Sequence, residues 1–184
     1  MRAVTSADVT AFWAAMMQHF GTERAPLQEA STLLSKLTTN PSAFRSSVTI
    51  RNRIYTYYTP GIATVQWPLF EQVANCVHEH HHVLQDRSKP GREFYLEYSS
   101  NSTSRAHAEA EAYRCDMVLY WRYLNEALKP VEVAHHLWEY GCKRQDIAMA
   151  EHMLLLSMKA VRKGAVPGEA CQYAVGWLDC RFGG

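Results

Sequence analysis

The segment from residue 68 to residue 87 constrains the fold most, because it joins an apolar helical pattern to a run of histidines. From Phe70 to Leu84, apolar residues recur three and four positions apart, the period of a helix with one buried face. Pro68 suits the first turn of such a helix. Inside it stands the sequence His-Glu-His-His-His, residues 78–82. This helix must therefore pack one side into a core and carry four imidazoles.

The helical register separates these histidines into two groups. A helix advances about 100° per residue, so side chains four positions apart lie one turn apart on the same side. His78 and His82 form such a pair and Glu79 follows the first, which is the pattern H-E-x-x-H. In that pattern two imidazoles bind one zinc ion and the glutamate is a general base. His80 and His81 point elsewhere, and the alternative is a histidine-rich surface turn without a metal.

A catalytic zinc ion needs a third protein ligand. The extended motif H-E-x-x-H-x-x-G-x-x-H is excluded, because Gln85 and Ser88 occupy its glycine and final histidine positions. A later predicted helix, residues 104–128, offers Glu109 and Glu111. Glu109 lies about 60° from the centre of the apolar stripe of that helix, and Glu111 about 140° from it. Helical phase therefore favours Glu109 as the ligand and predicts that Glu111 points to solvent.

These motifs resemble a known class of enzymes. An HExxH segment followed by Val-Leu-Gln and then, about 25 residues later, by Glu-Ala-Glu-Ala-Tyr on a helix is similar to gluzincin-type zincin-like metallopeptidases, in particular the M48 and ImmA/IrrE-like branches. The resemblance covers about residues 48–128. It implies that His78, His82 and Glu109 bind Zn²⁺ and that Glu79 is the catalytic base. It also implies an α+β, mostly helical zincin-like fold, with a small antiparallel sheet packed over the HExxH helix.

Other polar residues could complete such a site. Asp116, seven residues after Glu109, shares its helix edge and could orient a ligand histidine. Tyr113 stands four residues after Glu109, where the family often has Asp or Asn. Tyr98 or Tyr113 could stabilise an oxyanion, but ten tyrosines give no basis for a choice. Three further histidines could assist catalysis or have ordinary structural roles: His107, His135 and His136.

The rest of the chain predicts a single domain, 1–184, with a motif core at about 48–128 and a helical part at 131–180. Ser6 is expected to cap a first helix that ends at Gly21, and Pro26 to open a second helix through Leu37. Residues 47–58 predict one or two strands, 62–67 a short strand, and 94–98 an extended segment. The remaining predicted helices are 104–128, 131–140, 144–163 and 168–180.

Composition limits the classes of partner and the cellular compartment that we expect for this chain. The net charge of +1 argues against a protein that tracks nucleic-acid phosphates. No stretch approaches the roughly 18–20 apolar residues that cross a bilayer, and the first residues lack the apolar region of a secretory signal. Five widely spaced cysteines without a C-x-x-C pair indicate reduced, mostly buried thiols. We therefore expect a cytoplasmic protein that acts on a peptide or protein substrate, without nucleic-acid or membrane partners.

Three functions compete for this pattern. The first is a zinc metallopeptidase for limited, specific proteolysis, in which Glu79 moves a proton from the attacking water to the leaving amine. The second is a zincin-fold regulatory or binding module without catalysis, although a purely structural site would not need Glu79. The third is a ferritin-like di-iron bundle, since Glu79 and His82 also form E-x-x-H. That bundle needs a second E-x-x-H and two further glutamates.

Overall fold

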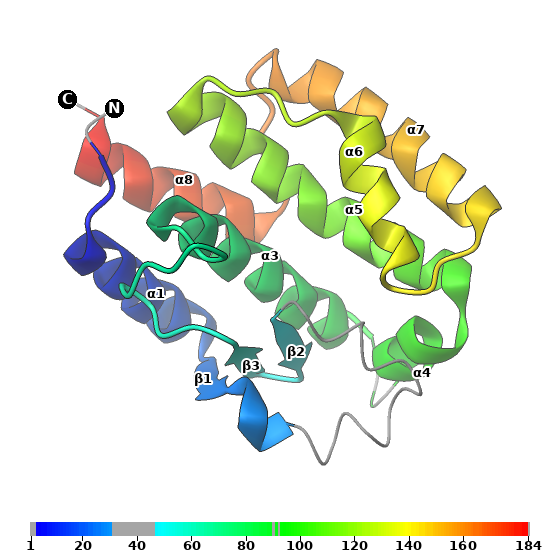
Figure 1. Cartoon of the computed structure of the whole chain (residues 1–184), viewed down its shortest axis with the longest axis horizontal. Coiled ribbons are helices and arrows are strands. Elements are labelled where there is room, and N and C mark those ends of the chain that lie inside the picture. Colours follow the sequence, from blue (N-terminus) through cyan, green and yellow to red (C-terminus); the bar gives the residue numbers. More distant parts are fainter. Residues whose placement is uncertain (1–2, 31–46, 90, 92, 184) are drawn as a thin grey trace.

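The computed structural model describes residues 3–30, 47–89, 91 and 93–183, which form mostly helices with a small sheet at one end (Figure 1). The histidine-bearing helix α3, Leu69–Arg87, runs through the middle of the molecule. It packs against α1 (Ser6–Phe20), α5 (Ser102–Leu119) and α8 (Glu169–Phe182). The expected α+β, mostly helical class is confirmed, and α3 is surrounded on several sides as its apolar pattern requires.

Helix α1 begins and ends on clear capping signals. Thr5, rather than the expected Ser6, is the N-cap: its hydroxyl accepts from the Asp8 amide at 3.3 Å, and the Asp8 carboxylate accepts from the Thr5 amide at 3.1 Å. Gly21 ends the helix at φ 57°, the left-handed conformation that glycine adopts without strain. The Trp13 indole donates to the Gln72 carbonyl of α3 at 3.1 Å. This bond fixes α1 against α3.

The sequence predicted an antiparallel sheet, but the observed sheet is mixed. Its strands are β1 (Glu23–Pro26), β2 (Val48–Ile50) and β3 (Arg53–Thr56), in the spatial order β1-β3-β2. The two strands predicted within 47–58 are confirmed as the antiparallel pair β2–β3. The third strand was missed: β1 pairs with β3 in parallel, from the register Glu23↔Arg53 to Pro26↔Thr56. Pairing across about thirty residues of chain leaves no local sequence pattern.

Two local predictions around β1 and the start of α3 were wrong. Pro26 ends β1, and only one 3-10 turn, Leu27–Ala30, follows. The rest of the predicted helix through Leu37 lies outside the described residues. The segment 62–67 forms an irregular, bent loop and not a strand, and the side chain of Gln72 binds its backbone. The Gln72 amide nitrogen donates to the carbonyls of Ile62 and Trp67, at 2.8 and 2.9 Å.

The segment predicted to be extended forms the short helix α4, Glu93–Ser100. Phe94 and Tyr98 lie one turn apart on it, with ring centroids 5.8 Å apart. Both rings lie toward His82 of α3, at 6.4 and 6.1 Å between centroids. Aromatic residues raise strand propensity, but that preference depends on the surface against which they pack. Here the helical spacing lets two rings cover one side chain.

The C-terminal half is close to the prediction. Asn101 caps α5, which starts two residues early and continues as a π-helical turn, Tyr120–Leu124. Asn125 then adopts φ 54°, so the helix stops short of residue 128. The other elements are α6 (Pro130–His135), a 3-10 turn (His136–Trp138), α7 (Arg144–Val161) and α8.

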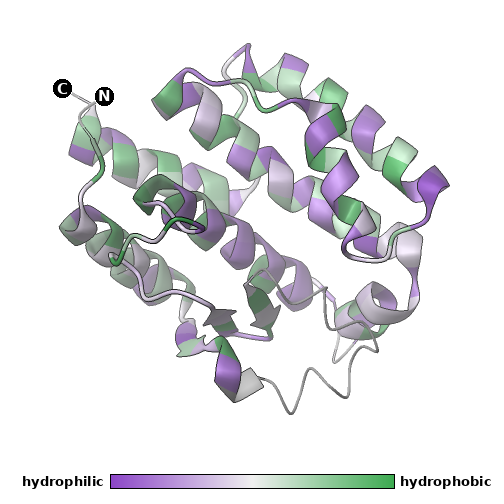
Figure 2. Ribbon diagram, viewed as in Figure 1, coloured by the Kyte–Doolittle hydropathy of each residue, from purple (hydrophilic) through white to green (hydrophobic). Residues whose placement is uncertain are grey.

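Hydrophilic and hydrophobic residues are interspersed along the helices (Figure 2), as expected for elements that each bury one side. One large apolar cluster joins side chains of α1, α3, α5, α7 and α8. The prediction of mostly buried cysteines is confirmed: four are buried and Cys180 is exposed, and none of the five forms a disulfide. Among the described residues, no helix has the length and apolar character needed to cross a membrane.

Candidate metal centre

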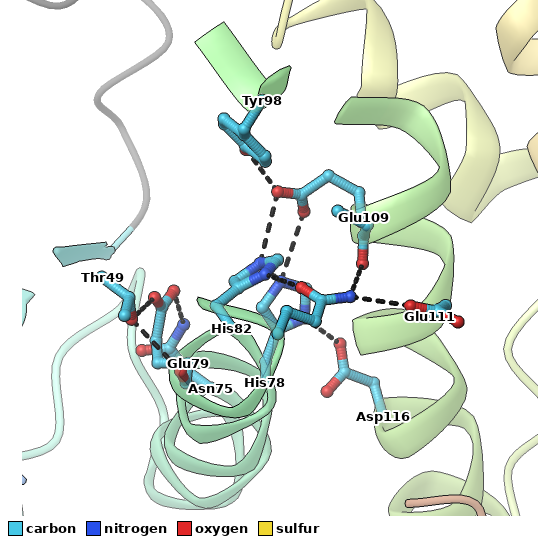
Figure 3. Close-up of polar contacts among 11 residues, drawn as sticks. Thr49, Asn75, His78, Glu79, His82, Tyr98, Glu109, Glu111 and Asp116 are labelled. Carbon is cyan, nitrogen blue, oxygen red and sulfur yellow. Dashed lines mark hydrogen bonds and ion pairs between the residues drawn. The ribbon is translucent and has the colours of Figure 1, made fainter. Parts of the chain in front are cut away.

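Three predicted ligands meet between α3 and α5. His78 Nε2 lies 3.3 Å from one Glu109 carboxylate oxygen, and His82 Nε2 lies 3.3 Å from the other (Figure 3). One ligand atom from each of the three residues fits within a mutual distance of 4.8 Å. The exposed fractions are 5% for His78, 7% for His82 and 1% for Glu109. Helical phase therefore placed Glu109 correctly, on the buried side of α5.

The chemistry of these atoms fits a cation. The outer nitrogen of each imidazole, Nδ1, faces an oxygen acceptor: Asp116 Oδ2 at 3.1 Å for His78, and Gln85 Oε1 at 2.7 Å for His82. In each neutral ring the proton therefore sits on Nδ1, and the Nε2 atoms direct lone pairs toward each other across 3.2 Å. Beside them, Glu109 Oε2 is buried and accepts no hydrogen bond. This group needs positive charge at its centre, either protons or a metal ion.

Asp116 occupies the position that sequence phase predicted for a residue orienting His78. Its carboxylate holds the Nδ1 proton of that ring, the usual arrangement behind a metal-binding histidine. Tyr113, which replaces the acidic or amide residue of the resembled family, packs its ring edge-on against His78, with 4.9 Å between centroids. A carboxylate three residues further along α5 thus takes the orienting role.

The prediction for Glu111 was partly wrong. It does not point freely into solvent but is half-buried, and its Oε2 accepts from Gln85 Nε2 at 2.9 Å (Figure 3). The exposed His107 lies 3.8 Å from the same carboxylate. Phase alone missed this contact, because the long side chain of Gln85 reaches Glu111 from the neighbouring helix. Glu111 is outside the ligand group, as expected.

Glu79 points from α3 toward strand β2, about 60–100° around the helix from the two histidines. Its two carboxylate oxygens accept from the Thr49 hydroxyl at 2.6 Å and from the Asn75 amide at 3.4 Å (Figure 3). Burial raises the pKa of the Glu79 carboxyl above its ordinary value, although the nearby His82 and His78 act to lower it. Sequence reasoning missed Thr49, since a contact between β2 and α3 depends on how the sheet packs.

The histidines and the carboxylates of the cluster stabilise one another's charged forms. Burial lowers the pKa of the His78 imidazole, but the carboxylates of Asp116 and Glu109 outweigh it and raise that pKa well above the usual value. Burial acts to raise the pKa of the Glu109 carboxyl, yet His82 and His78 hold it well below its usual range. Glu109 therefore stays ionised next to the two rings, which is the protonation state of a metal ligand.

Helix α4 covers the third side of the cluster. The hydroxyl of Tyr98 donates a hydrogen bond to Glu109 Oε1 (Figure 3). Burial, followed by the Glu109 charge, raises the pKa of the Tyr98 phenol well above its usual value, so it stays a donor. Tyr98 was one of two tyrosines considered from the sequence, and no sequence signal selected it.

The other histidines lie outside the ligand group. His80 is fully buried and donates from Nδ1 to the Cys76 carbonyl at 2.7 Å, which leaves Nε2 to accept from the Thr22 hydroxyl at 2.9 Å. His81 lies on another side of α3, with Nδ1 4.0 Å from Cys115 Sγ. The alternative of a histidine-rich surface turn was therefore wrong for this helix. The remaining candidates are exposed: His107, His135 and His136.

Comparison of the chain with protein-family models, with curated proteins and with solved structures found no match. The resemblance to gluzincin-type metallopeptidases therefore rests on the residues of the site, and the zincin-like fold stays a prediction. What the described residues contain is one buried His-His-Glu group that could hold a metal ion.

Proposed function

We propose that the chain is a zinc-dependent metallopeptidase, with His78, His82 and Glu109 as zinc ligands and Glu79 as general base. One observation carries the proposal: three ligand side chains from two helices converge, and a buried carboxylate adjoins the first of them in sequence. Two histidines and one glutamate are a common ligand set of catalytic zinc, which leaves a fourth position open. Zinc is favoured because imidazole nitrogens suit it better than they suit magnesium or calcium.

In the proposed reaction, the metal and the side chains of the protein have different roles. A bound zinc ion would lower the pKa of a water molecule toward about 7 and polarise a peptide carbonyl. Glu79 accepts the proton of the attacking water and later donates it to the leaving nitrogen. The raised pKa of Glu79 brings its basicity closer to what proton transfer near neutral pH requires. Thr49 and Asn75 hold the Glu79 carboxylate in place.

The surroundings of the site favour limited, specific proteolysis. Strand β2 is an edge strand of the sheet that the described residues form, and its residue Thr49 contacts Glu79. An extended peptide could pair with such an edge. Helix α4 lies on the cluster through Tyr98, so a substrate that reaches the metal would meet this helix.

A second candidate is a zinc-binding module without catalysis. It is favoured by the burial of the whole group, including Glu79, whose exposed fraction is 3%. It is also favoured by the two hydrogen bonds that occupy both oxygens of Glu79. In this case the metal would join α3 to α5 and stabilise the fold without opening to a substrate.

The substitution Glu79→Gln separates the two candidates. We expect the purified variant to keep the zinc content of the parent, by elemental analysis, and to lose cleavage of a broad peptide library. The matched control is Glu132→Gln at a side chain that is 63% exposed, which should cleave like the parent. A parent that binds zinc and cleaves no peptide would favour the binding module. Equal cleavage by Glu79→Gln and the parent would remove Glu79 as the base.

A further inference from the structure

Gln85, three residues after His82 on α3, binds the ring of that ligand. Its Oε1 lies 2.7 Å from His82 Nδ1, which is shorter than the corresponding bond from His78 to Asp116. A metal-binding imidazole needs its second nitrogen held in this way, because the bond fixes both the tautomer and the orientation of the ring. Gln85 therefore does for His82 what Asp116 does for His78.

The orientation of the Gln85 amide is fixed from the far side. Its nitrogen donates one hydrogen to the Ala108 carbonyl at 3.1 Å and the other to Glu111 Oε2 at 2.9 Å. Both of these groups only accept hydrogen bonds, so they bind the NH₂ end of the amide and not its oxygen. The oxygen must then face His82. A flipped amide would set two donors against the imidazole N–H and an oxygen against a carboxylate.

An amide at this position also limits the charge of the site. Three carboxylates already surround the two histidines: Glu79, Glu109 and Asp116. A fourth carboxylate in direct contact with His82 would add a buried negative charge that needs its own compensation. Gln85 orients the His82 ring without adding a charge. The charge of Glu111 acts on that ring only through the Gln85 amide.

We propose that Gln85 is a positioning residue for the metal ligand His82, and that Glu111 holds the Gln85 amide in the required orientation. This inference rests on the proposed metal site. Residues behind a metal ligand of this kind typically contribute about 10–100-fold to metal affinity. The proposal gives Glu111, the second glutamate of the Glu-Ala-Glu segment, a role at the site without making it a ligand.

Two variants and one control test the proposal by zinc affinity, in competition with a chelator at fixed pH. Gln85→Met keeps the side-chain length but removes the acceptor, and we expect the zinc dissociation constant to rise about 10–100-fold. The double variant Gln85→Glu with Glu111→Gln restores an acceptor for His82 and a donor behind it, with the same total charge as the parent. We expect this variant to bind zinc more tightly than Gln85→Met but less tightly than the parent, because a charge now lies against His82 and the Ala108 carbonyl loses its donor. The control Gln145→Met makes the same substitution at an exposed glutamine of α7 and should bind like the parent.

Cobalt(II) provides a readout that a merely structural role of Gln85 would not change. Its visible absorption depends on ligand geometry, so Gln85→Met should alter the spectrum and the double variant should restore it. Thermal unfolding of each metal-free variant shows whether the fold is kept, and the double variant carries the test if Gln85→Met does not fold. Parent-like affinity and spectrum in Gln85→Met, or a double variant without recovery, would overturn the proposal. A parent that binds zinc without cleaving peptides would remove the peptidase function alone, and one that binds no zinc would overturn both.

Discussion

The buried histidine His80 should contribute a loss of stability in mild acid. Burial, together with the charge of Arg87, lowers the pKa of its imidazole from 6.5 to about 4, despite the opposing bond to the Cys76 carbonyl. The folded state therefore holds His80 neutral, while the unfolded chain protonates it below about pH 6.5. Since the unfolded state then binds more protons at this residue, the contribution of His80 to stability falls as the pH falls from 6.5 to 4. His78 and His82 contribute in the opposite direction, because the nearby carboxylates raise their pKa values against the effect of burial. Above pH 6.5 His80 has little effect.

The size of the effect follows from the two pKa values. At pH 5.5 the unfolded histidine is mostly protonated and the folded one mostly neutral, so the free energy of unfolding decreases by about 1 kcal/mol. Below pH 4 the loss reaches about 3 kcal/mol, because each pKa unit corresponds to about 1.4 kcal/mol. For a chain of this size, a loss of 1 kcal/mol lowers the melting temperature by about 2–4 °C.

Urea unfolding of the parent and of His80→Gln at pH 7.5 and pH 5.5 isolates this contribution, with a chelator present so that metal binding does not contribute. The variant His80→Gln is destabilised at both pH values, but its stability should fall by about 1 kcal/mol less between them than that of the parent. The control His107→Gln changes a half-exposed histidine and should keep the parental dependence. The reasoning is refuted if His80→Gln loses as much stability as the parent, or if NMR finds the His80 ring protonated at pH 5.5.

Three further predictions concern the metal centre. The double variant His78→Ala, His82→Ala should contain no zinc by elemental analysis, whereas the parent should contain about one ion per chain; full retention would exclude the site. Glu109→Ala should bind zinc severely more weakly than the parent in a chelator titration, while Glu111→Ala should lose less than about tenfold, because Glu111 acts only through an amide. The reverse order would show that the wrong glutamate was assigned. Tyr98→Phe removes the hydrogen bond to the Glu109 carboxylate and should weaken zinc binding by about 10–100-fold; unchanged affinity would make Tyr98 only a cover for the site.

The sequence determined those parts of the site that depend on the geometry of a single helix. An imidazole pair four residues apart lies on one side of any helix, so His78 and His82 were paired before any tertiary contact was known. The same angular argument separated Glu109 from Glu111, because the apolar stripe of α5 identifies its buried side. The strands within 47–58 were recognised by their β-branched and aromatic residues, which form β2 and β3.

Only the tertiary structure decided which side chains from other elements complete the centre. Thr49 on strand β2 contacts Glu79. Tyr98 on α4 contacts Glu109. Gln85 on α3 contacts Glu111 on α5. Each contact joins residues more than ten positions apart, and such pairs leave no periodic signal in a single sequence. The same reason explains the unexpected helix at 93–100 and the parallel strand β1, since packing partners outweighed local preference in both. Local periodicity thus identified the candidate ligands along each helix, and long-range packing determined their surroundings.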